Sequence, residues 1–200
     1  MPVSDKHKII FIHIPKNGGT SIAQYLEMEN IGHYHFSHYQ QYPKKWKNYN
    51  KIAISRNPWD RFVSCYEYSK MENSFYHSVE GDSIYGKHPD YDLLRDKSFE
   101  ECVTIAKLTP DLLNHQGWKS QLSWISNEKE EIQVNHIFKL ENIDDEKTGL
   151  LSIVNNENPI PKVNLSTRKD YKEYYTEETK DIIKEIYKKD IINLGYEFDD

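Results

Sequence analysis

The feature that most constrains the fold lies near the N-terminus, where a short apolar run meets a pair of glycines. Residues 8–14 read KIIFIHI, which is β-branched, almost continuously apolar and directly followed by Pro15. Such a run is typical of a strand buried on both faces. The pair Gly18–Gly19 follows, and apolar residues then recur at helical spacing over 22–26. The segment therefore predicts a strand, a glycine-rich turn and a helix.

Two further strand candidates follow along the chain, each with a helix behind it. Residues 51–56 (KIAISR) precede a helix expected over 59–69, with Pro58 near its first turn, where a missing N–H costs nothing. Residues 134–140 (VNHIFKL) precede a helix expected from about 144 to 154. Strands that alternate with helices predict an α/β protein. We expect a P-loop-like three-layer fold, with a central, mainly parallel sheet flanked by helices.

Two more helices are expected outside this alternating pattern. One spans 99–108, capped by Ser98 with Glu101 at the capping-box position. The other spans 176–194, where isoleucines and a tyrosine form one apolar stripe and Gly195 is placed to end the helix. The stretches between the helices show no period and predict loops. No internal repeat or linker divides the chain, so residues 1–200 are interpreted as a single domain.

Length, charge and cysteine content exclude several classes. The chain has 200 residues, 26 basic against 32 acidic, and a net charge of −6, which argues against nucleic-acid binding. No apolar run approaches the length of a membrane span, and Pro15 and Lys16 interrupt the only N-terminal candidate for a signal peptide. Cys65 and Cys102 lack metal-site or CxxC spacing, so both are interpreted as buried apolar residues. We expect a cytoplasmic protein without a membrane partner. The sequence indicates no particular oligomeric state.

The turn HIPKNGGTS (13–21) has the chemistry of a phosphate loop. Its glycines allow the backbone to approach an anion, and hydroxyls and Lys16 add donors. The alternative is an ordinary strand-to-helix turn. The triphosphate-binding pattern GxxxxGK[ST] is absent because Lys16 precedes the glycines, and no apolar strand ends in an Asp for Mg²⁺. The loop therefore favours a metal-free phosphate or phosphosulfate.

A second anion segment reads ISRNPWDRFVSCY (54–66). Arg56 follows a predicted strand at its carboxyl end, where open α/β sheets bind ligands. Ser64 lies eight residues on, about two helical turns along the next helix. A guanidinium and a hydroxyl could then share one phosphate. Asp60 fits a first-turn partner of the helix dipole, and Arg61 fits either a structural or a cofactor-facing cation.

Together the two motifs resemble those of the sulfotransferase family, in the branch of heparan sulfate 2-O- and chondroitin carbohydrate sulfotransferases. HIPKNGGTS is similar to the family's 5′-phosphosulfate loop, and SRNPWDRFVSCY to its 3′-phosphate segment. The order and spacing of the motifs also match, and the C-terminal residues resemble the family's closing loop and tail. The resemblance implies transfer of a sulfuryl group from 3′-phosphoadenosine-5′-phosphosulfate (PAPS) to a hydroxyl, without metal, leaving adenosine 3′,5′-bisphosphate.

The resemblance also implies roles for individual residues. Arg56 and Ser64 would hold the 3′-phosphate, and Lys16 would stabilise the bridging oxygen of the leaving phosphate. Arg168 would reach a phosphate from a closing loop that includes Asn164 and Ser166, although a surface position fits Arg168 nearly as well. The 5′-phosphosulfate would be held by Pro15, Lys16, Asn17, Gly18, Gly19, Thr20 and Ser21. Asn17 stands where the family commonly has Thr.

A base for the acceptor hydroxyl is expected in the histidine cluster GHYHFSHY (32–39). His33 and His35 would share one face if the segment were a strand, and the pair resembles the catalytic histidines of the 2-O-sulfotransferase branch. His35 is the first candidate, His33 the second and His38 the third. A metal site on the three imidazoles and a set of half-exposed surface histidines are the alternatives. His13 is interpreted as a buried core residue.

The acceptor is expected to be a hydroxyl of a carbohydrate or small molecule. The segment HQGWKSQLSW (115–124) carries donors, acceptors and aromatic faces, and the resemblance assigns acceptor contacts to His115, Lys119 and Gln121. His38 is a further candidate for an acceptor contact. Its tryptophans fit sugar stacking or helix packing about equally. Two other functions remain open: a catalytically silent nucleotide- or glycan-binding module, and a nucleotide kinase with a P-loop fold.

Overall fold

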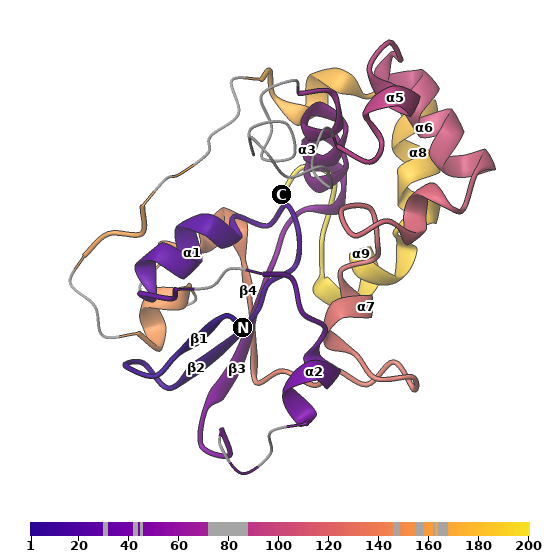
Figure 1. The fold of residues 1–200 in the computed structure, drawn as a ribbon. Coiled ribbons are helices and arrows are strands. Elements are labelled where there is room, and N and C mark those ends of the chain that lie inside the picture. The colour runs from indigo at the N-terminus through magenta and orange to yellow at the C-terminus, as the bar shows by residue number, and fades with distance from the viewer. Residues whose placement is uncertain are drawn as a thin grey trace, which may run out of the picture. The chain divides into compact units, whose positions relative to one another are not determined.

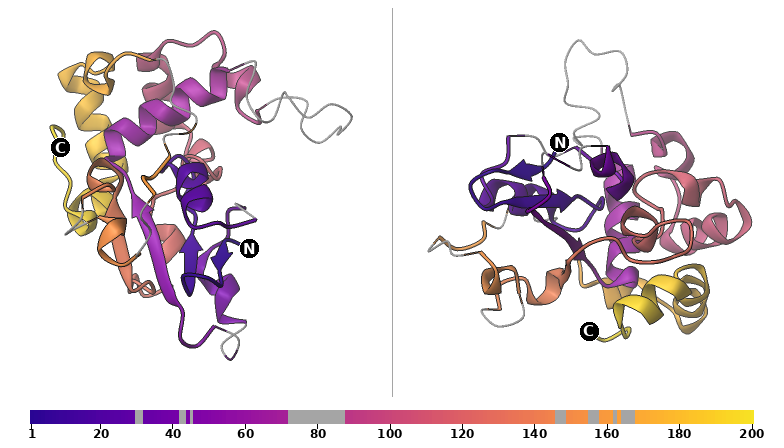
Figure 2. Two further views of the ribbon diagram at one scale, coloured as in Figure 1. Left: turned by 90° about the vertical axis from the view of Figure 1, so that its left-hand side faces the viewer. Right: turned by 90° about the horizontal axis from the view of Figure 1, so that it is seen from below.

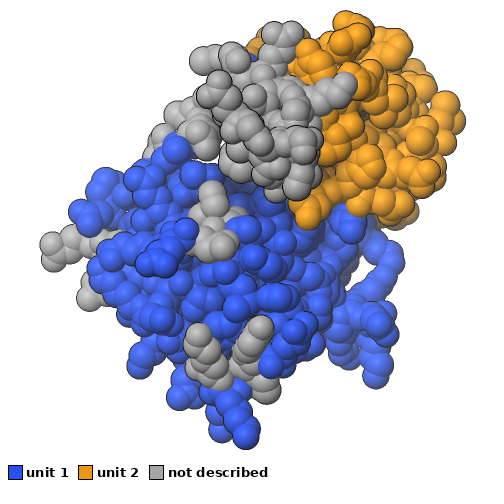
Figure 3. Space-filling model, in the orientation of Figure 1, with its two compact units in different colours: residues 1–57, 119–168, 189–200 blue, residues 58–118, 169–188 orange. Residues whose placement is uncertain are grey.

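A computed structural model describes residues 1–29, 32–41, 44, 46–71, 88–145, 149–154, 158–161, 163 and 168–200. The chain forms two compact units, each assembled from separate stretches of sequence (Figure 3). Unit 1 comprises Met1–Asn57, Lys119–Arg168 and Lys189–Asp200, and unit 2 comprises Pro58–Trp118 and Lys169–Lys188. The interpretation of residues 1–200 as a single domain stays a prediction.

Unit 1 contains a mixed, mostly parallel sheet (Figures 1 and 2). Among the described residues the strand order is β1-β2-β3-β4, with β1 antiparallel to β2 and the other neighbours parallel. Phe11 lies opposite Ile52, and Ile54 lies opposite Phe138. The strands are β1 (Val3–Ser4), β2 (Ile9–Ile12), β3 (Asn50–Ser55) and β4 (His136–Lys139). The three predicted strands are confirmed; β1, with two residues, is too short to show a pattern.

Helices cover both faces of this sheet. Alternate side chains of β2 point to opposite faces, so Phe11 packs with Ile22 of α1 (Gly19–Tyr25), while Ile12 packs with Phe36 of α2 (Phe36–Gln40). Trp124 of α7 (Leu122–Ile125) joins the second core. The short turns η2 (Leu140–Asn142) and η3 (Leu150–Ser152) lie beyond β4. The predicted α/β fold, a mainly parallel sheet between helical layers, is therefore present.

Two predicted helices differ in detail. Of the helix expected over 144–154, the described residues contain only η3 after position 145, and residues 146–148 lie outside the described part. The helix expected over 176–194 is divided at Tyr187 into α8 (Glu177–Ile186) and α9 (Lys188–Leu194). Gly195 ends α9 with φ of 64°, as expected for a glycine at this position.

Unit 2 is helical in its described residues. Its helices are α3 (Pro58–Lys70), α5 (Tyr91–Leu94), α6 (Phe99–Leu108) and α8, with the short turns η1 (Leu112–Asn114) and η4 (Tyr171–Tyr174). The predicted capping box of α6 is confirmed, because Ser98 Oγ accepts from Glu101 N and Glu101 Oε2 accepts from Ser98 N. Phe62 contacts the Phe99 and Trp118 rings.

Cys65 and Cys102 are free and buried, as the sequence predicts. Burial raises the pKa of the Cys102 thiol, which keeps it protonated. No helix within the described residues is both long and apolar enough to cross a membrane.

Candidate functional site

The predicted phosphate loop joins β2 to α1 with an unusual backbone. Lys16 and Gly18 both have φ of 71°, in the left-handed region. Glycine adopts this conformation without strain, whereas a lysine in it requires support from its surroundings. Gly18 is also the N-cap residue of α1 and makes no side-chain cap bond. The shape of the loop is therefore set by its backbone. Because Gly18 has no side chain, the first N–H groups of α1 receive no capping bond from this residue.

Gly19 is required because the ring of His13 lies against it. A Cβ built on Gly19 would lie 1.7 Å from His13 Nε2, far inside any permitted contact. His13 is buried and stacks on Phe11, with 5.4 Å between ring centroids, so its ring has little room to move. His13 is thus the buried core residue that the sequence predicts. Its imidazole also forms one side of the phosphate loop.

Gly19→Ala is expected to lower the free energy of unfolding by about 2 kcal/mol, because the added methyl group must displace the His13 ring. Chemical denaturation measures this change. Gly117→Ala is the matched control, since a Cβ there would meet only Cys65 Sγ, at an ordinary 3.7 Å. Equal stability of the two variants would contradict the packing of His13 on Gly19.

Asn17 points into the protein. The residue is 1% exposed, and its Nδ2 donates to Ile54 O at 2.6 Å and to Gln121 Oε1 at 2.7 Å. Both amide protons are therefore used inside the protein, and Oδ1 is buried without a hydrogen-bond partner. The predicted cofactor contact of Asn17 cannot use this amide N–H group. The side chain instead fastens the loop to the end of β3.

Arg56 connects the two predicted anion segments. It directly follows β3, and its Nη1 donates to Lys16 O at 2.9 Å. This bond holds the carbonyl of the residue whose φ is positive, so the guanidinium supports the loop conformation. Two cationic residues from separate motifs are thereby placed at one loop, as the sequence predicts for an anion site.

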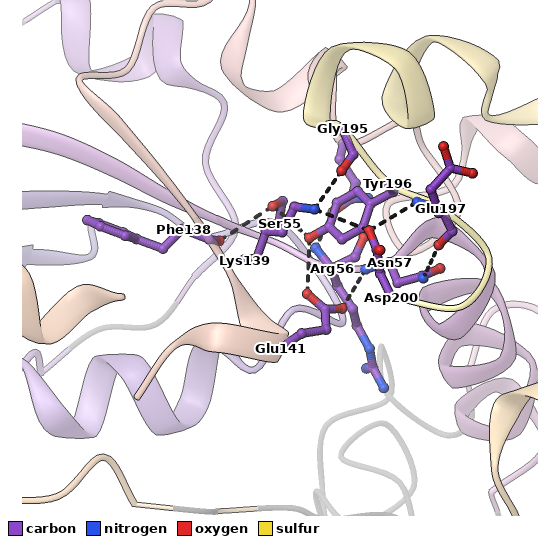
Figure 4. Close-up of polar contacts among 11 residues, drawn as sticks. Ser55, Arg56, Asn57, Phe138, Lys139, Glu141, Gly195, Tyr196, Glu197 and Asp200 are labelled. Carbon is purple, nitrogen blue, oxygen red and sulfur yellow. Dashed lines mark hydrogen bonds and ion pairs between the residues drawn. The ribbon is translucent and has the colours of Figure 1, made fainter. Parts of the chain in front are cut away.

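The carboxyl ends of β3 and β4 are tied to the C-terminal tail (Figure 4). Tyr196 OH is 2.9 Å from Ser55 Oγ and donates to Glu141 Oε2 at 3.1 Å, while Glu141 Oε1 accepts from Asn57 N at 2.7 Å. Burial, followed by the charge of Glu141, raises the pKa of Tyr196, so this phenol stays a donor. The side chain of Arg56 extends away from this cluster (Figure 4).

Residues 32–39 do not form a strand, so the condition under which His33 and His35 would share one face is not met. His35 is the N-cap residue of α2, and its Nδ1 accepts from Ser37 N at 3.2 Å. A backbone N–H can only donate, so the Nδ1 lone pair is used and neutral His35 carries its proton on Nε2. Burial, the largest cause, and the charge of Lys119 lower the pKa of His35, while a hydrogen bond to the Ser123 backbone opposes them in part.

His33 has the opposite tautomer. Its Nδ1 is 2.9 Å from His13 O, and a carbonyl only accepts, so Nδ1 carries the proton and the Nε2 lone pair is basic. The His33 ring lies 4.0 Å from that of His13, which packs on Gly19. His33 is thereby anchored to the residue that leads into the phosphate loop. His38 lies in α2 and stacks on Tyr34 at 4.7 Å.

Ser21 and Thr20 are half-buried in the first turn of α1, and Ser21 Oγ accepts from Val163 N at 3.0 Å. Arg168 is half-buried in unit 1, and Asn164 and Ser166 lie outside the described residues. Ser64 belongs to α3 of unit 2, so its predicted contact with the phosphate near Arg56 stays a prediction.

The predicted acceptor residues differ in their exposure and in their hydrogen bonds. His115 is an exposed residue of unit 2, and its Nδ1 lies 2.6 Å from Asp90 Oδ1. Lys119 is an exposed residue of unit 1, close enough to His35 to affect its pKa. Gln121 is 0% exposed, and its amide is bonded within the protein, which differs from the predicted acceptor contact. Of the two interpretations of Arg61, the structural one fits, because the side chain is buried and donates to Gly117 O.

Three polar residues that hold the site together were absent from the sequence prediction: Glu141, Asp190 and Tyr196. Glu141 comes two residues after the end of β4, and Arg56 comes directly after β3, so a polar residue at the carboxyl end of a predicted strand is a signal that could have been used. Asp190 lies three residues after Tyr187 and four after Ile186, on the apolar side of the predicted helix, so a charged residue within that stripe is a second signal that could have been used. Within the described residues, no group of three or more His, Cys, Asp or Glu side chains is placed to hold a metal ion.

These features define a class of α/β protein: a parallel strand leads through a glycine-rich, lysine-bearing loop into a helix, and an arginine from the next strand bonds that loop. The model of the Sulfotransferase family matches residues 1–197. The chain therefore belongs to the sulfotransferase family, as its two motifs predict, and the carbohydrate sulfotransferase branch fits this family. No curated protein and no solved structure matches the sequence significantly.

Proposed function

We propose that the protein transfers a sulfuryl group from PAPS to a hydroxyl of a carbohydrate or small-molecule acceptor. Family membership supports sulfuryl transfer in general. The observation that carries the choice of donor is the bond from Arg56 Nη1 to Lys16 O at 2.9 Å, which places a guanidinium beside the phosphate loop. A donor with phosphate groups at the 3′ and the 5′ position of its ribose requires two such cationic segments, whereas a simple sulfate ester does not.

The residues of the loop fit this donor. The Lys16 ammonium and the hydroxyls of Thr20 and Ser21 belong to a segment that begins α1, and each can stabilise negative charge on a leaving phosphate. In the transfer, the bond from sulfur to the phosphate oxygen breaks and a bond from sulfur to the acceptor oxygen forms. The acceptor proton passes to a base, and the negative charge stays on the departing adenosine 3′,5′-bisphosphate. No metal is required for this balance.

We propose His33 as the base, ahead of His35, which sequence alone favours. His33 donates its Nδ1 proton to His13 O and so keeps a basic Nε2. His35 uses Nδ1 to cap α2, and an N-cap bond contributes about 1 kcal/mol, so the tautomer with a basic Nε2 is disfavoured. A base near neutral pH must also be held in place, and the His13 carbonyl does this for His33. His38 remains the third candidate.

The acceptor side of the proposal rests on charge. A net charge of −6 opposes binding of a highly sulfated chain, so a neutral or lightly charged hydroxyl substrate is favoured. His115 and Lys119 stay candidates for acceptor contacts, because both are exposed.

The two free cysteines support a reducing, cytoplasmic location.

The decisive experiment is a thermal-shift titration with adenosine 3′,5′-bisphosphate. A ligand that binds only the native state raises its stability by RT ln(1 + [L]/Kd), about 2.7 kcal/mol at a hundredfold excess over Kd. We expect the melting temperature to rise by several degrees at millimolar bisphosphate. ATP with Mg²⁺ serves as the parallel arm, in which stabilisation and turnover would indicate a kinase. An unchanged melting temperature with bisphosphate would exclude PAPS as donor. Binding without transfer of labelled sulfate to any hydroxyl acceptor would indicate a silent binding module.

A further inference from the structure

We propose that Gln121 and Asp190 are positioning residues that lock the phosphate loop to the carboxyl end of β3. The inference rests on the proposed function, because it assigns the way in which the donor site is held in shape. It gives Gln121 a different role from the acceptor contact that sequence predicts. It also gives a role to a buried carboxylate that no motif includes.

Gln121 bonds both segments of the donor site through one side chain. Its Oε1 accepts from Asn17 Nδ2 at 2.7 Å and from Arg56 N at 2.9 Å, and its Nε2 donates to Arg56 O at 2.8 Å. The amide thus pairs with the backbone of Arg56 as a neighbouring strand would. Because Gln121 is 0% exposed, it cannot touch substrate and must act through these bonds.

Asp190 holds Gln121 in place from a distant part of the chain. Its carboxylate accepts from Ser120 Oγ at 2.6 Å, from Gln121 N at 2.7 Å and from Leu122 N at 3.0 Å. The residue is 1% exposed, and a buried carboxylate is tolerated only where several donors compensate its lost hydration. Three donors on three consecutive residues fix the start of α7, and with it the Gln121 side chain.

The consequence is a fixed geometry between loop and arginine. Asn17 is fastened to the end of β3 by Ile54 O and by Gln121, while Arg56 is fastened to Gln121 by its backbone and to Lys16 by its guanidinium. These bonds close a ring in which the loop cannot shift without moving Arg56. Such preorganisation raises affinity for the transition state, because no rearrangement is needed on binding.

The experiment measures bisphosphate affinity and steady-state kinetics of Gln121→Leu, Asp190→Asn and Asn17→Ala in the full chain. We expect Gln121→Leu and Asp190→Asn each to weaken adenosine 3′,5′-bisphosphate binding at least tenfold. Titration calorimetry well below each melting temperature separates this effect from global stability, since the protein is then fully folded. Met28→Ala is the control: Met28 is buried in the core of unit 1, so the variant is destabilised, yet it should bind as wild type.

A double-mutant cycle tests the coupling directly. Asn17→Ala and Gln121→Leu both remove the bond between Asn17 Nδ2 and Gln121 Oε1, and each removes other bonds of its own, so the double variant should lose less affinity than the sum of the two single losses. Additive losses, wild-type affinity in Gln121→Leu, or an equal loss in Met28→Ala would each overturn the proposal. If the wild type itself fails to bind bisphosphate, the proposed donor fails instead, and the two failures are thereby distinguished.

Discussion

Arg56→Ala is expected to lower the affinity for adenosine 3′,5′-bisphosphate by at least a hundredfold. A hydrogen bond to a charged group contributes about 1.5–3 kcal/mol, and the guanidinium would make such a bond to phosphate. The same variant removes the donor to Lys16 O, which leaves a lysine in the left-handed region without its support. A combined loss of about 3 kcal/mol corresponds to slightly more than a hundredfold in Kd.

Two companion variants make this result specific. Arg56→Lys keeps the charge but not the planar set of donors, so its affinity should lie between those of the wild type and Arg56→Ala. Arg95→Ala removes an exposed arginine of unit 2 that pairs with Asp96 on the surface, and it should bind bisphosphate as the wild type does. Calorimetric titration of all three variants provides the measurement. Tight binding by Arg56→Ala would remove this arginine from the donor site.

The parts of the site that could be predicted from sequence are those encoded by neighbouring residues. The β2 strand, the glycine turn and α1 follow one another, and each has a local signal: apolar continuity, then a left-handed glycine, then helical spacing. Arg56 was placed correctly because the carboxyl ends of parallel strands lie at one edge of a sheet. A bond such as Arg56 to Lys16 O then requires only the predicted sheet order.

The parts that could not be predicted depend on bonds between distant residues. The apolar stripe around Asp190 indicates that the residue is buried, but nothing in the chain indicates that its carboxylate accepts from Ser120, Gln121 and Leu122. The histidine segment was misread for a related reason: an alternating pattern fits a strand, but His35 and Ser37 instead form a local cap that starts α2. Hydrogen-bond direction, which decides the tautomers of His33 and His35, is a property of the folded chain alone.

His33→Asn is expected to lower kcat by about 10²–10⁴, the range that general-base catalysis contributes, while leaving bisphosphate affinity within about twofold. The basic Nε2 of His33 is fixed by the bond from Nδ1 to His13 O, and asparagine has no group that accepts a proton at neutral pH. Steady-state kinetics with any accepted hydroxyl substrate gives the measurement. His35→Asn is the matched control, because asparagine is a favourable N-cap residue and preserves the start of α2. The larger loss should belong to His33→Asn.

The pH dependence separates the two histidines even where both variants lose activity. The charge of Lys119 contributes to holding the pKa of His35 below its usual 6.5, so Lys119→Gln raises that pKa. If His35 were the base, activity would require its neutral form, and Lys119→Gln would move the acid limb of kcat/KM to higher pH. With His33 as the base, the acid limb should stay where the wild type has it. A shift of the limb to higher pH in Lys119→Gln would return the catalytic role to His35, and the His13 carbonyl would then orient a histidine that takes no proton.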